Sequence, residues 1–144
     1  CTNEVADHTI MLMLALRKRL PYLQRRVNGE RIWETASLET LGIRGVWGQT
    51  LGIVGLGKIG KAVAKRAKPF GMRVIAVDPF KPDEDFEAVG AERVDIDYLL
   101  ANSDVISSHM DLNPTSELYF DAEKFAKMER KPIFLNVSRG GEVD

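Results

Sequence analysis

The chain has 144 residues, of which 44% are hydrophobic and 28% are charged, so it can bury one core and we expect a single domain. Its 20 basic and 21 acidic residues leave a formal charge of −1 and are scattered, so we expect no nucleic acid as a direct partner. Cys1 is the single cysteine, which excludes an intrachain disulfide and a zinc site built from cysteines and favours a reducing compartment, the cytoplasm.

The start of the chain predicts two helices. The first has Thr2 or Asn3 as its N-cap and an apolar body over residues 10–16, a run too short to span a bilayer, so we expect no membrane partner. In the second, Pro21 suits the first turn and the Asn-Gly pair at 28–29 ends the helix. The apolar first helix has to be covered by the sheet, by another domain or by another subunit.

The stretches that flank the second helix carry basic and aromatic residues. Basic residues stand at positions 17–19 and 25–26, near predicted helix ends, where the helix dipole favours positive charge. We interpret them as solvated helix ends rather than as a contact patch. From residue 30 to 49 no hydrophobic period is sustained, but Trp33 and Trp47 indicate an ordered loop.

From residue 50 onward the pattern alternates between strand and helix signals. Residues 50–54 and 73–77 are short β-branched runs that predict strands, and Gly71 is the expected C-cap of the helix between them. That helix has an apolar stripe, interrupted by one arginine, at Ile59, Ala62, Val63, Arg66, Ala67 and Phe70.

The same alternation continues to the end of the chain. Strands are expected at 91–94, 104–108 and 133–137, with a short helix at 97–101 and another running from the capping Asp121 to about Glu129. Alternating elements of this kind predict an α/β fold with three layers, a doubly wound parallel sheet covered by helices on both faces.

The turn after the first strand carries a G-x-G-x-x-G pattern at Gly55, Gly57 and Gly60. The pattern alone is common, but here it leaves a strand and opens a helix, as in a dinucleotide-binding turn. We expect Gly55 to allow the tight turn, Gly57 to admit a pyrophosphate, and Gly60 to pack the helix on the strand. The amides near Lys58 and Ile59 would face phosphate oxygens.

An acidic residue, Asp78, follows 23 positions after Gly55 at the end of the second strand. Its carboxylate can accept hydrogen bonds from the adenosine ribose hydroxyls and would repel the extra phosphate of NADP, so the predicted cofactor is NAD. The alternative is that Asp78 merely begins a turn at Pro79, and Lys81 nearby would soften the repulsion.

Four blocks of the chain resemble the cofactor-binding domain of the D-isomer-specific 2-hydroxyacid dehydrogenases. They are residues 5–9, the glycine motif with Asp78, residues 103–109, and residues 136–141. The resemblance implies an NAD-binding Rossmann domain over residues 1–144, with 1–30 as an interdomain or dimer arm and 50–144 as the core. It also implies a homodimer, a separate substrate domain outside this chain, and hydride transfer between NAD(H) and a small 2-hydroxy or 2-oxo acid.

The resemblance also assigns roles to residues of the site. It implies that Arg139 holds the carboxylate and carbonyl of the 2-oxo acid beside the nicotinamide, a task that suits a planar guanidinium. Taken without the family, Arg139 would be an ordinary surface arginine. The other residues that the resemblance assigns to the cofactor are Met110, Asp111 and Ser116 on the adenine and ribose side, and Val137 and Ser138 at the nicotinamide end.

The chain departs from the family pattern at two positions, where Asp111 replaces a usual proline and Thr115 replaces a usual acidic residue. His109 is interpreted as part of the cofactor wall rather than as a base. The family's catalytic histidine and glutamate lie beyond the last strand, so we expect these 144 residues to bind NAD without turning over substrate, and which acid is used stays open.

Two other functions compete with the enzyme. Residues 43–45, Ile-Arg-Gly, look somewhat like the C-terminal-binding-protein corepressors, in which NAD binding drives dimerisation and partner recruitment. An unrelated Rossmann protein, such as a short-chain dehydrogenase, is disfavoured by Arg139 and by the absence of a Tyr-x-x-x-Lys pair.

Overall fold

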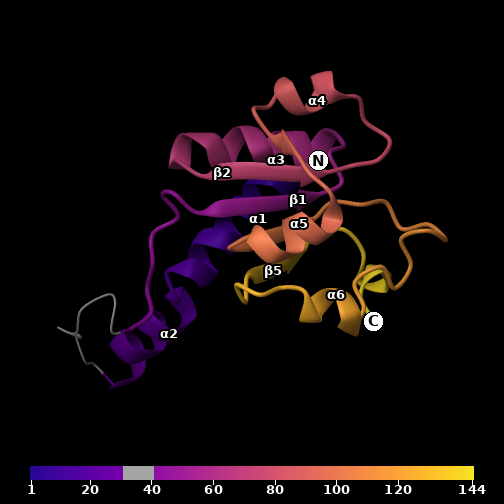
Figure 1. Cartoon of the computed structure of the whole chain (residues 1–144). Helices are drawn as coiled ribbons and strands as arrows, with labels where there is room; N and C mark the ends of the chain where they lie inside the picture. The colour runs from indigo at the N-terminus through magenta and orange to yellow at the C-terminus, as the bar shows by residue number, and fades with distance from the viewer. Residues whose placement is uncertain (31–40) are drawn as a thin grey trace.

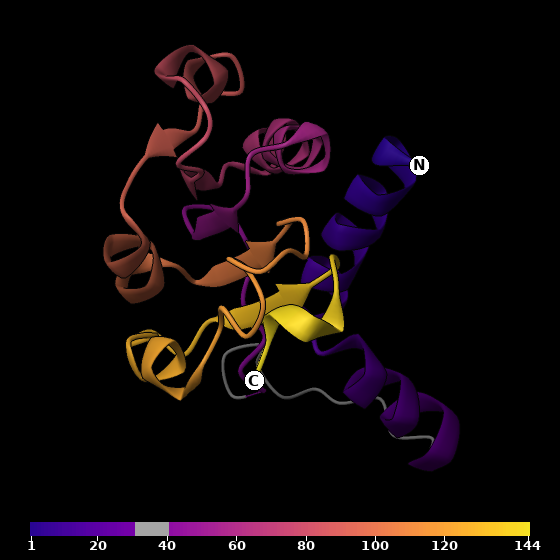
Figure 2. The same ribbon diagram turned by 90° about the vertical axis from the view of Figure 1, so that its right-hand side faces the viewer.

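The computed structural model describes residues 1–30 and 41–144, which form a parallel sheet between two layers of helices (Figures 1 and 2). The strands of this part of the chain are β1 (Thr50–Val54), β2 (Arg73–Val77), β3 (Glu92–Arg93), β4 (Val105–Ser108) and β5 (Ile133–Asn136). The helices are α1 (Thr2–Arg17), α2 (Leu20–Arg25), α3 (Lys58–Ala67), α4 (Asp83–Glu87), α5 (Ile96–Asn102) and α6 (Ala122–Ala126), with a π-helix at Arg26–Glu30 and 3-10 turns at Lys68–Phe70 and Gly140–Glu142.

The strand order is β3-β2-β1-β4-β5, and every pairing is parallel. The chain moves outward from β1 to β3 and then returns to place β4 on the other side of β1, which makes a switch point between β1 and β4. The register pairs Val54 with both Val77 and Ser108, so the carboxyl ends of the three central strands lie level. Ligands of open parallel sheets bind at such an edge.

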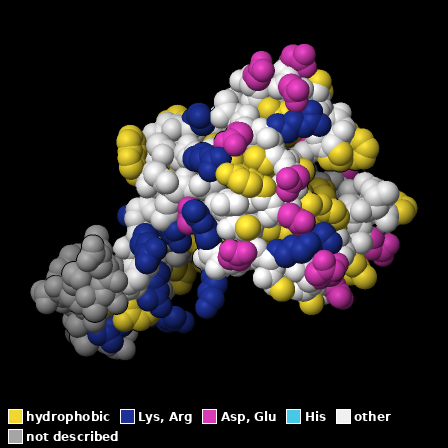
Figure 3. Space-filling model, viewed as in Figure 1, with side chains coloured by type: hydrophobic (Ala, Val, Ile, Leu, Met, Phe, Trp, Pro, Cys, Tyr) yellow, Lys and Arg dark blue, Asp and Glu magenta, His cyan; other side chains and the backbone are white. Residues whose placement is uncertain are grey.

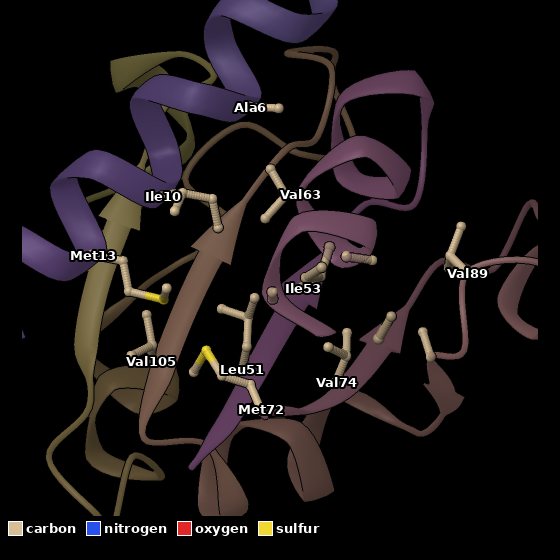
Figure 4. Close-up of a cluster of buried hydrophobic side chains, with 14 of the residues drawn as sticks. Ala6, Ile10, Met13, Leu51, Ile53, Val63, Met72, Val74, Val89 and Val105 are labelled. Carbon is tan, nitrogen blue, oxygen red and sulfur yellow. The ribbon is translucent and has the colours of Figure 1, made fainter. Parts of the chain in front are cut away.

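Side chains at alternate strand positions point to opposite faces of the sheet and pack into two separate hydrophobic cores. On one face, Leu51, Ile53 and Val105 pack against Ile10 and Val63, which come from α1 and α3 (Figure 4). The opposite face holds a second core around Ile75, Leu99, Leu100, Ile106 and Phe120. The predicted doubly wound α/β sheet with helices on both faces is therefore confirmed.

Helix α1 differs from its prediction at its first turn. The N-cap is Cys1 and makes no side-chain cap bond, so neither Thr2 nor Asn3 is the cap. Asn3 instead accepts a hydrogen bond from Arg66 at 3.1 Å, and Arg66 also pairs with Asp7 at 2.6 Å. The arginine that interrupts the apolar stripe of α3 therefore ties α3 to α1. Across residues 1–30 and 41–144, the helices are all too short or too polar to cross a bilayer.

Other predicted boundaries also move. Helix α6 has the predicted cap, because the Asp121 side chain accepts from the Lys124 amide, but it ends at Ala126 rather than at Glu129. The Lys127 and Met128 amides bond to carbonyls three residues back, which tightens and ends the helix. Phe70 lies in the 3-10 turn and is 40% exposed, so it is not a core residue.

The predicted strand over residues 133–137 ends one residue early, at Asn136, where a side-chain turn begins. The predicted loop of residues 30–49 can be followed only in part, because Trp33 lies outside the described residues. Trp47 lies within them and is 81% exposed.

Two basic residues near α2 donate hydrogen bonds to the segment that precedes β1. Figure 3 shows Lys and Arg side chains gathered over this part of the molecule. Arg17 donates to the Gln49 side chain, and Arg19 donates to the Leu41 carbonyl oxygen at 2.6 Å while covering the Tyr22 ring. These contacts tie the leading helices to the segment before β1.

Candidate functional site

The turn from β1 into α3 depends on two glycines. Gly55 has a φ of 94°, in the left-handed region, and a Cβ at this position would lie 2.8 Å from the carbonyl oxygen of His109. A Cβ at Gly60 would overlap the carbonyl oxygen of Gly55. The two glycines therefore let α3 begin directly against the end of β1.

Gly57 differs from these two glycines because open space lies beside it. Among the described residues no heavy atom lies within 4 Å of the position that its Cβ would take, and its φ of −72° is open to any residue. It is the N-cap of α3 and provides no side-chain cap, so the first-turn N–H groups of Lys58, Ile59 and Gly60 have no acceptor within the helix. These N–H groups, with the positive end of the helix dipole, fit a phosphate.

Asp78, just past the end of β2, links the glycine turn to the neighbouring strand. Its Oδ2 accepts a hydrogen bond from the Leu56 amide at 2.8 Å, and its Oδ1 accepts one from the Phe80 amide at 3.0 Å. Each carboxylate oxygen keeps a further lone pair that can accept from a ligand hydroxyl. The two interpretations of Asp78, as a turn residue and as a ribose acceptor, are therefore compatible.

A cleft of about 510 Å³ opens at the carboxyl ends of β1, β2 and β4, and we call it the carboxyl-edge cleft. Its volume suits a small ligand. Several predicted cofactor residues lie on one surface there, because Gly55, Gly57, Asp78, Met110, Asp111 and Ser116 all line it. The remaining lining residues are Val54, Val77, Pro79, Phe80, Lys81, His109, Asn113, Thr115 and Tyr119.

One wall of the carboxyl-edge cleft is a turn that follows β4. The Asp111 carbonyl oxygen accepts from the Ser116 hydroxyl at 2.7 Å and from the Asn113 side chain at 2.9 Å. The Asn113 side chain in turn accepts from the Thr115 amide at 2.9 Å. Ser116 is buried and its hydroxyl proton is used inside the turn, so this residue shapes the wall of the cleft.

His109 belongs to the same wall and is neutral near pH 7. Its amide donates to the Val54 carbonyl oxygen at 2.8 Å, and its Nε2 lies 3.0 Å from the Ser107 hydroxyl. Burial lowers the pKa of His109 to about 4. Its Nδ1 is buried with no hydrogen-bond partner among the described residues. A neutral, half-enclosed imidazole fits the expected place in the cleft wall.

The segment after β5 carries the remaining predicted site residues and lies outside the cleft lining. The Asn136 side chain accepts from the Ser138 amide at 3.0 Å and donates to the Arg139 carbonyl oxygen at 2.9 Å. Arg139 is exposed, and its guanidinium donates to the Ser138 carbonyl oxygen at 2.9 Å. Val137, Ser138 and Arg139 thus lie at the same edge of the sheet as the cleft, but beyond β4 rather than beside the glycine turn.

Glu142 is a residue beside this segment that the sequence reasoning missed. Its side chain is fully buried, and its Oε2 accepts hydrogen bonds from the Ser108 hydroxyl at 2.7 Å and the Ser138 hydroxyl at 2.6 Å. It therefore joins the end of β4 to the segment that precedes Arg139. A glutamate in a glycine-rich stretch looks like a surface residue, so nothing in the sequence signals this burial.

The described residues hold no group of three or more His, Cys, Asp or Glu side chains arranged to bind a metal ion. The polar groups at the carboxyl edge include helix N–H groups, the carboxylates of Asp78 and Asp111, and an exposed guanidinium. This set of donors and acceptors fits a ligand that carries phosphates, hydroxyls and a carboxylate.

Comparisons with known proteins agree with this geometry. Residues 10–144 match the family model described as "D-isomer specific 2-hydroxyacid dehydrogenase, NAD binding domain". The D-3-phosphoglycerate dehydrogenase of Archaeoglobus fulgidus is 40% identical over 143 residues, which are 99% of this chain and 26% of the relative.

Solved structures give the same result. The D-lactate dehydrogenase of Salmonella has 35% sequence identity and a TM-score of 0.87, and the match covers 100% of this chain and 42% of that one. The D-lactate dehydrogenase of Aquifex aeolicus, solved with NAD and lactic acid, has 30% identity and a TM-score of 0.90 over 100% of this chain and 42% of that one. The chain thus spans about a quarter to under a half of these proteins.

Proposed function

The chain belongs to the D-isomer specific 2-hydroxyacid dehydrogenase family, of which it matches the NAD-binding domain. We propose that it is the cofactor-binding part of an oxidoreductase that interconverts a D-2-hydroxy acid and its 2-oxo acid. In this proposal residues 1–144 hold the cofactor, residues 1–30 form an arm, and residues 50–144 form the core. In this proposal a separate substrate domain supplies the catalytic histidine and glutamate, which is supported by the chain spanning only 26% and 42% of two relatives.

NAD binds across the carboxyl edge of the sheet in this proposal. Its pyrophosphate lies against Gly57 and accepts hydrogen bonds from the Lys58 and Ile59 amides. The ribose hydroxyls of its adenosine half donate to Asp78. The adenosine half lies along Met110, Asp111 and Ser116, while Val137, Ser138 and Arg139 border the nicotinamide end. When bound, NAD supplies or accepts the hydride.

Arg139 acts on the acid rather than on the fold in this proposal. Arg139 is exposed, and its guanidinium donates one hydrogen bond to the carbonyl oxygen of the preceding residue. A guanidinium has five N–H donors, so further ones can bind a ligand. A guanidinium can hold a carboxylate through two parallel hydrogen bonds and polarise the carbonyl beside it. Arg139 therefore orients the 2-oxo acid and stabilises negative charge on its carbonyl oxygen.

The observation that carries the cofactor assignment is the open space beside Gly57, next to helix N–H groups without acceptors. Gly57→Val is a selective test because the backbone at Gly57 suits any residue and its Cβ meets no atom of the described residues. The variant should fold normally but lose NAD binding by more than about tenfold in a calorimetric titration, because the valine occupies the space of the pyrophosphate.

Gly45→Val is the matched control, since among residues 1–30 and 41–144 a Cβ at Gly45 meets only the Trp47 amide nitrogen at 4.0 Å, and Gly45 does not line the cleft. This variant should bind NAD as the unchanged chain does. Equal NAD affinity in the two valine variants would reject the assignment of the pyrophosphate to Gly57.

The remaining parts of the proposal concern partners and location. The substrate is a small 2-oxo or 2-hydroxy acid, as the D-lactate and D-3-phosphoglycerate named for the relatives suggest. We propose a homodimer in the cytoplasm. Exposed apolar side chains on the leading helices and near the end of α3 support the dimer.

The relatives named above are dehydrogenases, so the corepressor-type binding module is not the favoured function. Turnover of 2-oxo acids by the whole protein with NADH separates the two functions. A corepressor would bind NAD without such turnover.

A further inference from the structure

The carboxyl-edge cleft contains two carboxylates, and they differ in what they do for the fold. Both oxygens of Asp78 accept backbone hydrogen bonds and so hold the glycine turn. The side chain of Asp111 makes no hydrogen bond or ion pair with the described residues, although it lines the same cleft. The carboxylate of Asp111 is therefore available to act on a ligand.

The backbone of Asp111 is nevertheless held in place. Its carbonyl oxygen accepts two hydrogen bonds, one from the buried Ser116 hydroxyl at 2.7 Å and one from Asn113 at 2.9 Å. Because the turn fixes this backbone, the charge of Asp111 stays at the rim of the cleft.

Little positive charge offsets the two carboxylates. Among the lining residues Lys81 is the single lysine or arginine. His109 adds no charge near pH 7, because burial lowers its pKa to about 4. A sphere of the cleft's volume is about 10 Å across, close to the Debye length at physiological ionic strength, so every charge on the lining acts on a ligand inside.

We propose that Asp111 is a second determinant, together with Asp78, of the cleft's selection against a dinucleotide that carries an additional phosphate on the adenosine ribose. The inference rests on the proposed function, because it requires the adenosine half of the cofactor to lie in this cleft. A phosphate monoester adds nearly two negative charges, and two fixed carboxylates disfavour it more than one does. Asp111 thus replaces the family's usual proline with a residue that acts through its charge.

The test compares the Kd values for NAD and NADP by calorimetry in Asp111→Asn, Asp111→Glu and the unchanged chain. In Asp111→Asn the ratio of the NADP Kd to the NAD Kd should fall by about fivefold in low salt, and the fall should shrink in 1 M salt as screening shortens the interaction. Asp111→Glu keeps the charge and should keep the ratio, which a purely structural role of the residue would not predict.

Glu129→Gln is the matched control because it removes the same charge from an exposed residue in the turn that leads into β5, outside the cleft lining. An equal fall of the ratio in this control would reject the inference in favour of an effect of net charge. An unchanged ratio in Asp111→Asn, with NAD still bound, would reject the inference and leave the proposed function standing. Failure of the unchanged, folded chain to bind NAD would reject both the inference about Asp111 and the proposed function.

Discussion

At the scale of single residues, polar side chains at the carboxyl edge form hydrogen bonds that hold the segments of the candidate site in place. Asp78 holds the glycine turn, Asn136 holds the backbone of Arg139, and Glu142 joins the ends of β4 and β5 through two serine hydroxyls. Side chains that hold one another and the backbone therefore decide where the ligand-binding groups lie, whether or not they also contact the ligand, as Asp78 does in the proposed function.

His109 predicts an acid-dependent loss of stability. Its pKa of about 4 in the folded chain is lower than the ordinary value of 6.5, so the unfolded state binds the extra proton more readily. The contribution of neutral His109 to stability is complete above pH 6.5 and is lost as the pH falls toward 4. The free energy of unfolding, measured in urea at pH 7.5 and pH 5, should fall between these two pH values in the unchanged chain. In His109→Gln the fall should be smaller by about 1 to 2 kcal/mol. Equal losses in the two proteins would contradict the assigned pKa.

Glu142 predicts a difference between two substitutions. Glu142→Ala leaves a cavity and removes the acceptor of two hydroxyls, so the free energy of unfolding should fall by about 2 kcal/mol. Glu142→Gln keeps an oxygen acceptor in a side chain of the same size and should stay within about 1 kcal/mol of the unchanged chain. Chemical unfolding of both variants checks this order, and equal losses would show that the two hydroxyl bonds are not the stabilising feature.

At the scale of elements, strands and helices were predictable where the hydrophobic period agrees with the turn-forming and capping residues at its ends. Strand 50–54 and strand 73–77 have the predicted bounds, because Gly55 follows the first run and the Asp78-Pro79 pair follows the second. Sequence patterns do not contain the contacts that decide the remaining details. Asn3 gives its side chain to Arg66 instead of capping α1, and the acidic helix α4 over Asp83–Glu87 has no sustained period that would predict it.

The same limit applies to the candidate site. The glycine spacing predicted Gly55, Gly57 and Asp78 at one edge of the sheet, because the ends of neighbouring parallel strands meet there. The burial of Glu142 depends on hydroxyls 34 and 4 residues away in the chain, and no local pattern encodes such a pairing.

The contact between β1 and α3 predicts opposite outcomes for two neighbouring glycines. Gly60→Ala places a methyl group on the Gly55 carbonyl oxygen, so α3 must move away from β1 and the chain should lose about 2 kcal/mol or more of stability. Gly57→Ala meets open space and should leave the melting temperature nearly unchanged. Thermal melts of the two variants test this, and equal melting temperatures would mean that α3 does not pack as described.

At the scale of the whole molecule, an apolar groove lies between α1 and the end of α3, next to the ion pair of Arg66 and Asp7. The groove is lined by exposed apolar residues that include Met11, Leu20 and Phe70. Covering such a surface is favourable, which is the physical basis for the proposed homodimer.

Sedimentation velocity tests the homodimer. The unchanged chain should sediment as a dimer, and Met11→Glu should sediment as a monomer because a charge enters the apolar groove. Leu112→Glu changes a residue of comparable exposure, 46% against 51%, outside the groove and should leave the dimer intact. A monomeric unchanged chain, or dissociation in both variants, would contradict this interface.

If NAD lies across the glycine turn and the carboxyl-edge cleft, an NMR titration of the labelled chain with NAD will show where it binds. We expect the largest amide shifts on Lys58, Ile59 and Gly60, on Asp78, and on residues 109–116 apart from Pro114, which has no amide proton. Absence of shifts at a saturating concentration, or shifts confined to the groove beside α1, would contradict this location of NAD.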